Sequence, residues 1–168
     1  MSLNGNGILY HASTIEVRQP LTNVGRKELD FGPGFYVTRD FAQAEKWAHT
    51  VAMRKKGARA IVNFYEFDKE SFLRFPCEKK TFFSYSVEWL DFIAGSRRGE
   101  KPWAHYDWIE GGIANDRVIS TVDAYVDGFI SAEQALDKLV NEELRHQICI
   151  SRQEIADKFL RFIKSEEV

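Results

Sequence analysis

The chain has 168 residues, a length that fits one domain with a core large enough to be stable without a metal or disulfides. Hydrophobic residues make up 44% and charged residues 29%, as in globular proteins, and the 13 phenylalanines indicate a thick core or an aromatic-lined pocket. A net charge of −2 excludes a nucleic-acid-binding surface spread over the whole domain, and the two cysteines match neither a metal spacing nor a disulfide framework.

The start of the chain is polar and unlike a signal peptide, and no apolar run is long enough to cross a membrane. Residues 1–7 are expected to form a disordered or vector-derived start, and residues 8–168 a single domain. Two cysteines without a framework, Cys77 and Cys149, are typical of a reducing compartment. The sequence therefore predicts a cytoplasmic protein without a membrane partner, and delivery to another cell by a signal-free route is equally compatible with it.

A Gly-Pro-Gly sequence at 32–34 is the clearest turn signal in the chain. It predicts a sharp turn with a positive φ at Gly34, followed by a strand that begins at Phe35. Backbone N–H groups in such a turn can face a ligand, and Tyr36 adds a flat ring with a hydroxyl tip. This stretch is therefore the first candidate binding element.

Apolar residues at helical spacing predict amphipathic helices, and short β-branched or aromatic runs predict strands. Capping boxes are expected at Asp40 with Gln43 and at Ser131 with Gln134. Because short strands and helices follow one another without a repeat or linker, the pattern predicts one α+β domain. The expected helices cover 40–56, 86–97, 115–126, 131–140 and 151–163. The expected strands cover 8–11, 35–38, 60–67, 72–75, 80–83, 106–109 and 147–150, with a loop at 15–29 and a turn at 111–112.

Several familiar signatures are present only in part. The Asp-Phe-Gly triplet at 30–32 lacks the other kinase motifs, and the Gly-x-Gly at 32–34 precedes a strand instead of following one. The four histidines lack zinc-type spacing, so no metal is expected. His146 and Cys149 would point to opposite faces of one strand, which argues against a thiol nucleophile.

Four segments, taken together and in this order, resemble the ADP-ribosyltransferase superfamily. They are Leu-Tyr-His-Ala-Ser at 9–13, Asp-Phe-Gly-Pro-Gly-Phe-Tyr-Val-Thr at 30–38, the block at 106–118 and Gln-Ile-Cys at 147–149. The resemblance is to an uncharacterised bacterial family in the branch whose signature is His, Tyr and Glu on three strands. It implies an ADP-ribosyltransferase-like fold, with two small packed β-sheets, a central cleft and flanking amphipathic helices.

The resemblance also implies that NAD is the substrate. His11 would hydrogen-bond a ribose hydroxyl of NAD, Tyr36 would stack on the nicotinamide ring, and Gln147 would take the place of the catalytic glutamate. Cleavage of NAD expels nicotinamide through an oxocarbenium-like state, and a cationic pyridinium is well held over an aromatic face. The implied NAD-binding residues are His11, Ala12, Ser13, Asp30, Gly34, Phe35, Tyr36 and Asn115.

Gln147 departs from the three-residue signature, because an amide can orient a ribose but carries no charge and cannot act as a general base. Two functions therefore stay open. One is transfer of ADP-ribose to an unknown protein or nucleic-acid acceptor, as in a bacterial toxin or modifying enzyme, with a carboxylate elsewhere contributing. The other is a module that binds NAD, ADP-ribose or a partner without catalysis. The carboxylate candidates are Asp30, Asp116, Glu142 and Glu143.

RNA 2′-phosphate transfer, which a related branch of the superfamily performs, is a third alternative. The modest basic content gives it less support than the other two. The sequence leaves the oligomeric state open.

Overall fold

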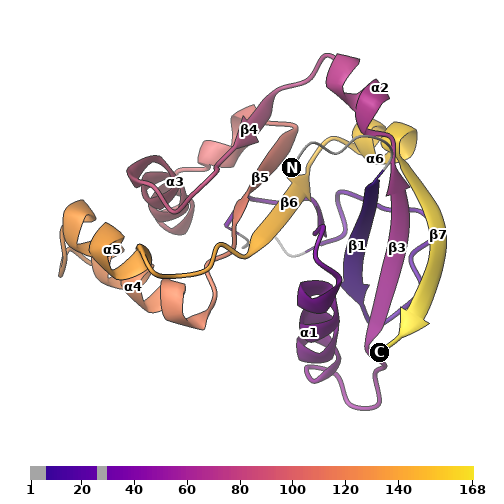
Figure 1. Ribbon diagram of the computed structural model, residues 1–168, viewed down its shortest axis with the longest axis horizontal. Helices are drawn as coiled ribbons and strands as arrows, with labels where there is room; N and C mark the ends of the chain where they lie inside the picture. Colours follow the sequence, from indigo (N-terminus) through magenta and orange to yellow (C-terminus); the bar gives the residue numbers. More distant parts are fainter. Residues whose placement is uncertain (1–6, 26–29) are drawn as a thin grey trace.

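The computed structural model describes residues 7–25 and 30–168, which form two small β-sheets and six α-helices (Figure 1). Sheet A has the strand order β1 (Gly7–Ser13), β3 (Ile61–Phe67), β7 (Leu160–Glu167), and both pairs are antiparallel. Sheet B has the order β2 (Phe35–Val37), β6 (His146–Ile150), β5 (Trp108–Gly112), β4 (Lys79–Thr81), with β4 and β5 parallel. The helices are α1 (Phe41–Ala52), α2 (Lys69–Arg74), α3 (Val87–Arg97), α4 (Asp116–Val126), α5 (Ala132–Leu139) and α6 (Gln153–Phe159), with a 3-10 helix η1 (Pro102–His105).

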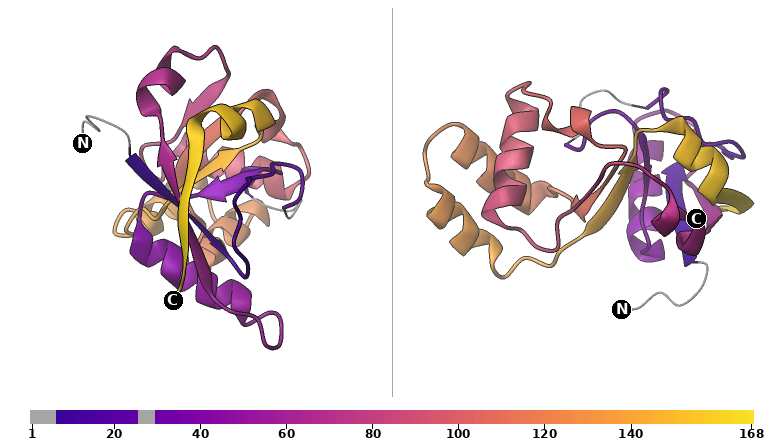
Figure 2. Two further views of the ribbon diagram at one scale, coloured as in Figure 1. Left: turned by 90° about the vertical axis from the view of Figure 1, so that its right-hand side faces the viewer. Right: turned by 90° about the horizontal axis from the view of Figure 1, so that it is seen from above.

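Sheet B lies between sheet A and a group of helices, and it packs on both (Figures 1 and 2). Because side chains alternate along a strand, Ile148 and Ile150 of β6 face sheet A, where they join a core that includes Leu9 and Phe67. Cys149, between them, faces a second core built on α3, α4 and α5. A smaller core lies between α1 and sheet A. The expected α+β architecture with two small packed sheets is confirmed.

The predicted helix starts agree well with the structure. Ser86 accepts a hydrogen bond from the Trp89 N–H at 3.2 Å, and Asn115 accepts one from the Val118 N–H at 3.1 Å. Ser131 and Gln134 form the predicted capping box. At α1, Asp40 caps the helix as expected, whereas the Gln43 amide donates to the His146 carbonyl at 2.6 Å and does not complete a box.

Several predicted elements are wrong or displaced. The segment 72–75 belongs to the end of helix α2 and not to a strand, because Asp68 caps a helical turn that buries Phe72. The expected turn at 111–112 is the end of β5, which begins at Trp108 and not at 106. A Cβ on Gly112 would lie 2.5 Å from the Tyr85 ring, so the strand can pass this point only without a side chain.

The ends of other elements also differ from expectation, among them strand β4, which covers Lys79–Thr81 and not 80–83. Helix α1 stops at Ala52 and not at 56, and α6 stops at Phe159 because the chain continues as strand β7. Ser151 does not cap α6, since its hydroxyl donates to the Tyr106 carbonyl. Gly7 already belongs to β1, while residues 1–6 of the expected start and 26–29 of the expected loop lie outside the described residues. No helix in the described ranges combines the length and apolar character that a bilayer crossing requires.

Candidate functional site

Strands β1 and β2 touch at one point and then separate. Tyr10 and Thr38 exchange both backbone hydrogen bonds, at 2.8 and 2.9 Å, and these are the backbone bonds between β1 and β2 within the described residues. Beyond this bridge, β1 stays paired with β3 in sheet A, and β2 stays paired with β6 in sheet B. We call the place where the two strands separate, between Ala12 and Tyr36, the β1–β2 split.

The His11 side chain occupies the β1–β2 split. Its Nδ1 lies 2.7 Å from the Tyr36 carbonyl oxygen, and since a carbonyl only accepts, Nδ1–H is the donor. The ring also stacks on Phe35, with centroids 4.1 Å apart and planes 27° apart. The backbone N–H and C=O groups of successive residues in a strand point to alternate sides of the strand. The Tyr36 carbonyl therefore points toward β1, as the Thr38 carbonyl does. His11 therefore supplies the hydrogen bond that β1 no longer provides.

Burial lowers the pKa of His11 to about 4, against the opposing effect of the hydrogen bond to Tyr36. The imidazole is consequently neutral at pH 7. With the proton on Nδ1, the Nε2 atom carries a lone pair that can accept a hydrogen bond. The split thus presents a fixed, uncharged acceptor.

Tyr36 and Gln147 lie on one face of sheet B. Tyr36 pairs with Cys149, and Gln147 precedes Cys149 by two residues, so the two side chains are diagonal neighbours on adjacent strands. The Tyr36 hydroxyl donates to the Gly32 carbonyl at 2.5 Å, and burial raises the pKa of Tyr36. Gln147 is half-buried and pairs with Gly111 of β5, which has no side chain to cover it.

The turn at 32–34 is packed on two sides. Gly32, and not Gly34 as expected, has the positive φ of 81°. A Cβ on Gly34 would lie 2.6 Å from the Cys149 sulfur, so this glycine is required by the close approach of the turn to β6. Trp103 lies directly against Gly32. The turn that holds Tyr36 is therefore rigidly positioned.

The remaining residues of the expected set have structural partners. Asp30 lies 3.5 Å from the Arg97 guanidinium of α3, and burial raises the pKa of Asp30. Asn115 caps α4, and the Ser13 hydroxyl accepts from the Ile15 N–H at 3.3 Å. The structure thus places His11, Ala12, Phe35 and Tyr36 at the split. It places Gln147 on β6, on the face of sheet B that carries Tyr36 and opposite to the stacked rings of His11 and Phe35. Asp30 and Asn115 are engaged with helices.

The other carboxylate candidates lie outside this group. Glu142 and Glu143 belong to the connection between α5 and β6, and in the described structure neither carboxylate contacts His11, Tyr36 or Gln147. Asp116 begins α4, and its side chain lies outside what the structure describes.

Sequence reasoning missed a partly buried cluster of Arg39, Glu110 and His146. Glu110 pairs with Ile148, so its side chain lies on the opposite face of sheet B from Gln147. Its carboxylate accepts hydrogen bonds from Arg39 and, at 2.6 Å, from His146 Nε2. Burial alone would raise the pKa of Glu110, but the hydrogen bond from His146 and the Arg39 charge outweigh it and hold the pKa at about 2.

This cluster has one unsatisfied atom. His146 Nδ1 is buried without a hydrogen-bond partner among the described residues. The available sequence signal was a glutamate inside the apolar strand that begins at Trp108, since an acidic residue there either faces solvent or is paired.

The described residues define an α+β protein whose two sheets separate at a histidine. The chain matches the profile of a family of proteins of unknown function, DUF3990, over residues 8–162, and it belongs to that family. Neither a curated protein nor a solved structure matches it.

Proposed function

We propose that this protein is an ADP-ribosyltransferase-like protein that binds NAD at the β1–β2 split and transfers ADP-ribose to a protein or nucleic-acid acceptor, releasing nicotinamide. The observation that carries the proposal is the contact between His11 and the Tyr36 carbonyl. It joins two of the three strands named by the resemblance, and β6, with Gln147, is paired directly to the second.

The backbone at the split suits a carboxamide. Tyr10 directs its N–H and C=O toward β2, so those of Ala12, two residues further on, point the same way. After the strands separate, Ala12 offers a donor and an acceptor at a strand edge, and the carboxamide of nicotinamide needs one of each. His11 Nε2 is an acceptor for a ribose hydroxyl, and the Gln147 amide is a second polar contact on the sheet B side.

Calorimetric titration of NAD tests the binding step. We expect the wild type to bind with a Kd between micromolar and sub-millimolar, roughly −8 to −5 kcal/mol. Tyr36→Ala should weaken binding at least about tenfold, because the ring that would hold the pyridinium is lost. Tyr125→Ala is the matched control, since Tyr125 bonds Asp91 between two helices. A folded wild type that does not bind NAD would refute the proposal.

A module without catalysis is the second candidate, and the position of Glu110 favours it. This carboxylate is on the strand next to Gln147 but faces the other side of sheet B, where it is paired with Arg39 and hydrogen-bonded to His146. On the Gln147 side, the Asp30 carboxylate acts on Tyr36, but it is paired with Arg97. The described contacts therefore give this side no unpaired negative charge to stabilise an oxocarbenium-like state.

Nicotinamide release from NAD separates the two candidates. If the protein is a transferase, the wild type releases nicotinamide and Gln147→Ala abolishes this activity. If it only binds NAD, the wild type releases no nicotinamide. Gln147→Glu should then gain slow NAD hydrolysis, because it puts a negative charge at the position of the catalytic glutamate. Gln134→Glu is the matched control, since a glutamate keeps the capping box of α5. Release that is unchanged in both Gln147 variants would remove Gln147 from the site.

A further inference from the structure

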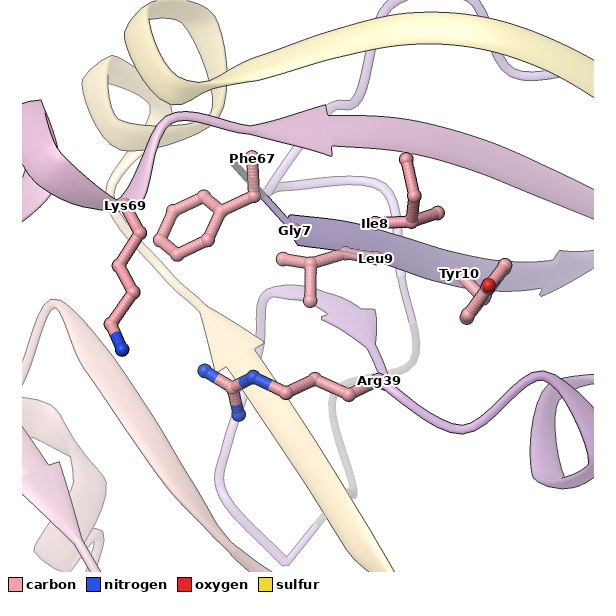
Figure 3. A pocket seen from close by; sticks show the side chains of 7 residues that line it. All are labelled: Gly7, Ile8, Leu9, Tyr10, Arg39, Phe67 and Lys69. Atoms are coloured by element: carbon pink, nitrogen blue, oxygen red, sulfur yellow. The ribbon is translucent and has the colours of Figure 1, made fainter. Parts of the chain in front are cut away.

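A cavity of about 300 Å³ lies beside the first half of β1 (Figure 3). Its walls include Ile8 and Leu9 of β1, Phe67 of β3, and two cationic residues, Arg39 and Lys69. The volume equals that of roughly ten water molecules and lies at the lower end of ligand-binding cavities. His11, Tyr36 and Gln147 do not line it, so it is a site separate from the β1–β2 split.

The cavity has an apolar side and a cationic side. Leu9 and Phe67 are 1% and 2% exposed and belong to the core between the sheets. Figure 3 shows the Phe67 ring and the Leu9 side chain directed toward the space between the Lys69 ammonium and the Arg39 guanidinium. A ligand seated here would therefore contact apolar groups at one end and N–H donors at the other.

The charges around the cavity do not balance. Arg39 donates from Nη1 to Glu110, and its other guanidinium nitrogens have no partner within the described residues. Lys69 forms no ion pair with any described residue. Arg39 is paired with Glu110, so Lys69 is the lining cation whose charge is not balanced by an ion pair with a described residue. A ligand with one negative charge would balance it.

We propose that this cavity binds a small monocarboxylate with an apolar body. The carboxylate lies between Lys69 and Arg39, where it accepts charge-assisted hydrogen bonds, which are stronger than those between neutral groups. The apolar body packs against Leu9 and Phe67, which reach the cavity with a small part of their surface. The inference is independent of the proposed NAD site, because the two sites share no lining residue.

Benzoate is the probe for the test, benzamide its uncharged isostere, and inorganic phosphate the competing anion. Each is titrated into the wild type and followed by amide chemical shifts. We expect benzoate to shift amides of residues 7–10, 39 and 67–69 and to bind at least fivefold more tightly than the other two. Lys69→Gln should weaken benzoate binding about tenfold, and Lys138→Gln, on the distant helix α5, should leave it unchanged.

The inference is overturned if benzoate does not bind, if its shifts fall elsewhere, or if benzamide binds equally well. Equal benzoate affinity in Lys69→Gln and the wild type would also overturn it. Tighter binding of phosphate, with the same dependence on Lys69, would replace the monocarboxylate with a phosphate ligand. Thermal unfolding of both lysine variants verifies that each is folded.

Discussion

At the scale of single residues, His11 connects the fold to the candidate site. Where the two sheets separate, its ring stacks on Phe35 and donates to the Tyr36 carbonyl the hydrogen bond that a neighbouring strand would otherwise provide. This role requires the neutral imidazole. The folded-state pKa of about 4 lies below the 6.5 of an unperturbed histidine. The unfolded chain therefore binds this proton first as the pH falls. Stability from His11 is complete above pH 6.5 and is lost as the pH falls toward 4.

We expect the free energy of unfolding to show this dependence. Between pH 7 and pH 5 the wild type should lose up to about 2 kcal/mol through His11. His11→Asn keeps an N–H donor for the Tyr36 carbonyl but cannot titrate. Its loss of unfolding free energy between the same two pH values should therefore be smaller than that of the wild type by about this amount. Urea unfolding of both proteins at several pH values gives the comparison. Parallel pH profiles would show that His11 is not buried as a neutral ring.

The sequence predicts candidate site residues, but it does not predict the contacts that each of them makes. The turn at 32–34 was evident, but its two glycines exchange roles, because the close packing of Gly34 on Cys149 depends on a strand more than a hundred residues away. Glu110 was not foreseen, since an isolated glutamate in a strand gives no sign of Arg39 and His146. Contacts between distant segments decide these details.

At the scale of elements, helices with capping residues were predictable and short strands were less so. The sequence predicts a helix up to residue 163, where the structure has strand β7, and a β-bulge explains the difference. Tyr65 pairs with Phe162 and Phe64 pairs with Lys164, so Ile163 is an extra residue without a partner. The bulge interrupts the alternation of apolar residues, and the resulting spacing imitates a helix.

Two alanine substitutions test this register. Leu160→Ala removes a side chain that is 8% exposed and should cost about 2–4 kcal/mol of unfolding free energy. Ile163→Ala removes a bulged side chain that is 42% exposed and should cost less than about 1 kcal/mol. Chemical denaturation measures both. Similar costs would instead indicate a helix with both residues on its buried face.

At the scale of the whole molecule, sheet B carries a core on each face. Ile148 faces sheet A and Cys149 faces the helices, so neither core can open without exposing the other side of the same strand. This arrangement explains why a chain with two visible lobes (Figure 1) is expected to behave as one cooperative domain.

Native-state hydrogen exchange measures this cooperativity. We expect the most protected amides of β3 and of α3 to converge on one opening free energy as denaturant is added, because both cores rest on sheet B. Amides of β1, which lies at a sheet edge, should open earlier. If the amides of α3, α4 and α5 all exchanged through a separate, lower opening free energy, the helical group would be an independent unit.

The strand order of sheet A has a consequence for synthesis. Strand β3 is flanked by the first strand of the chain and by the last one described, β1 and β7. At about 5–20 residues per second, translation from Phe67 to Leu160 takes on the order of ten seconds. During that interval one edge of β3 has no partner strand, while the local helices α3, α4 and α5 can already form. Sheet A is thus completed only after residues 160–167 have been synthesised.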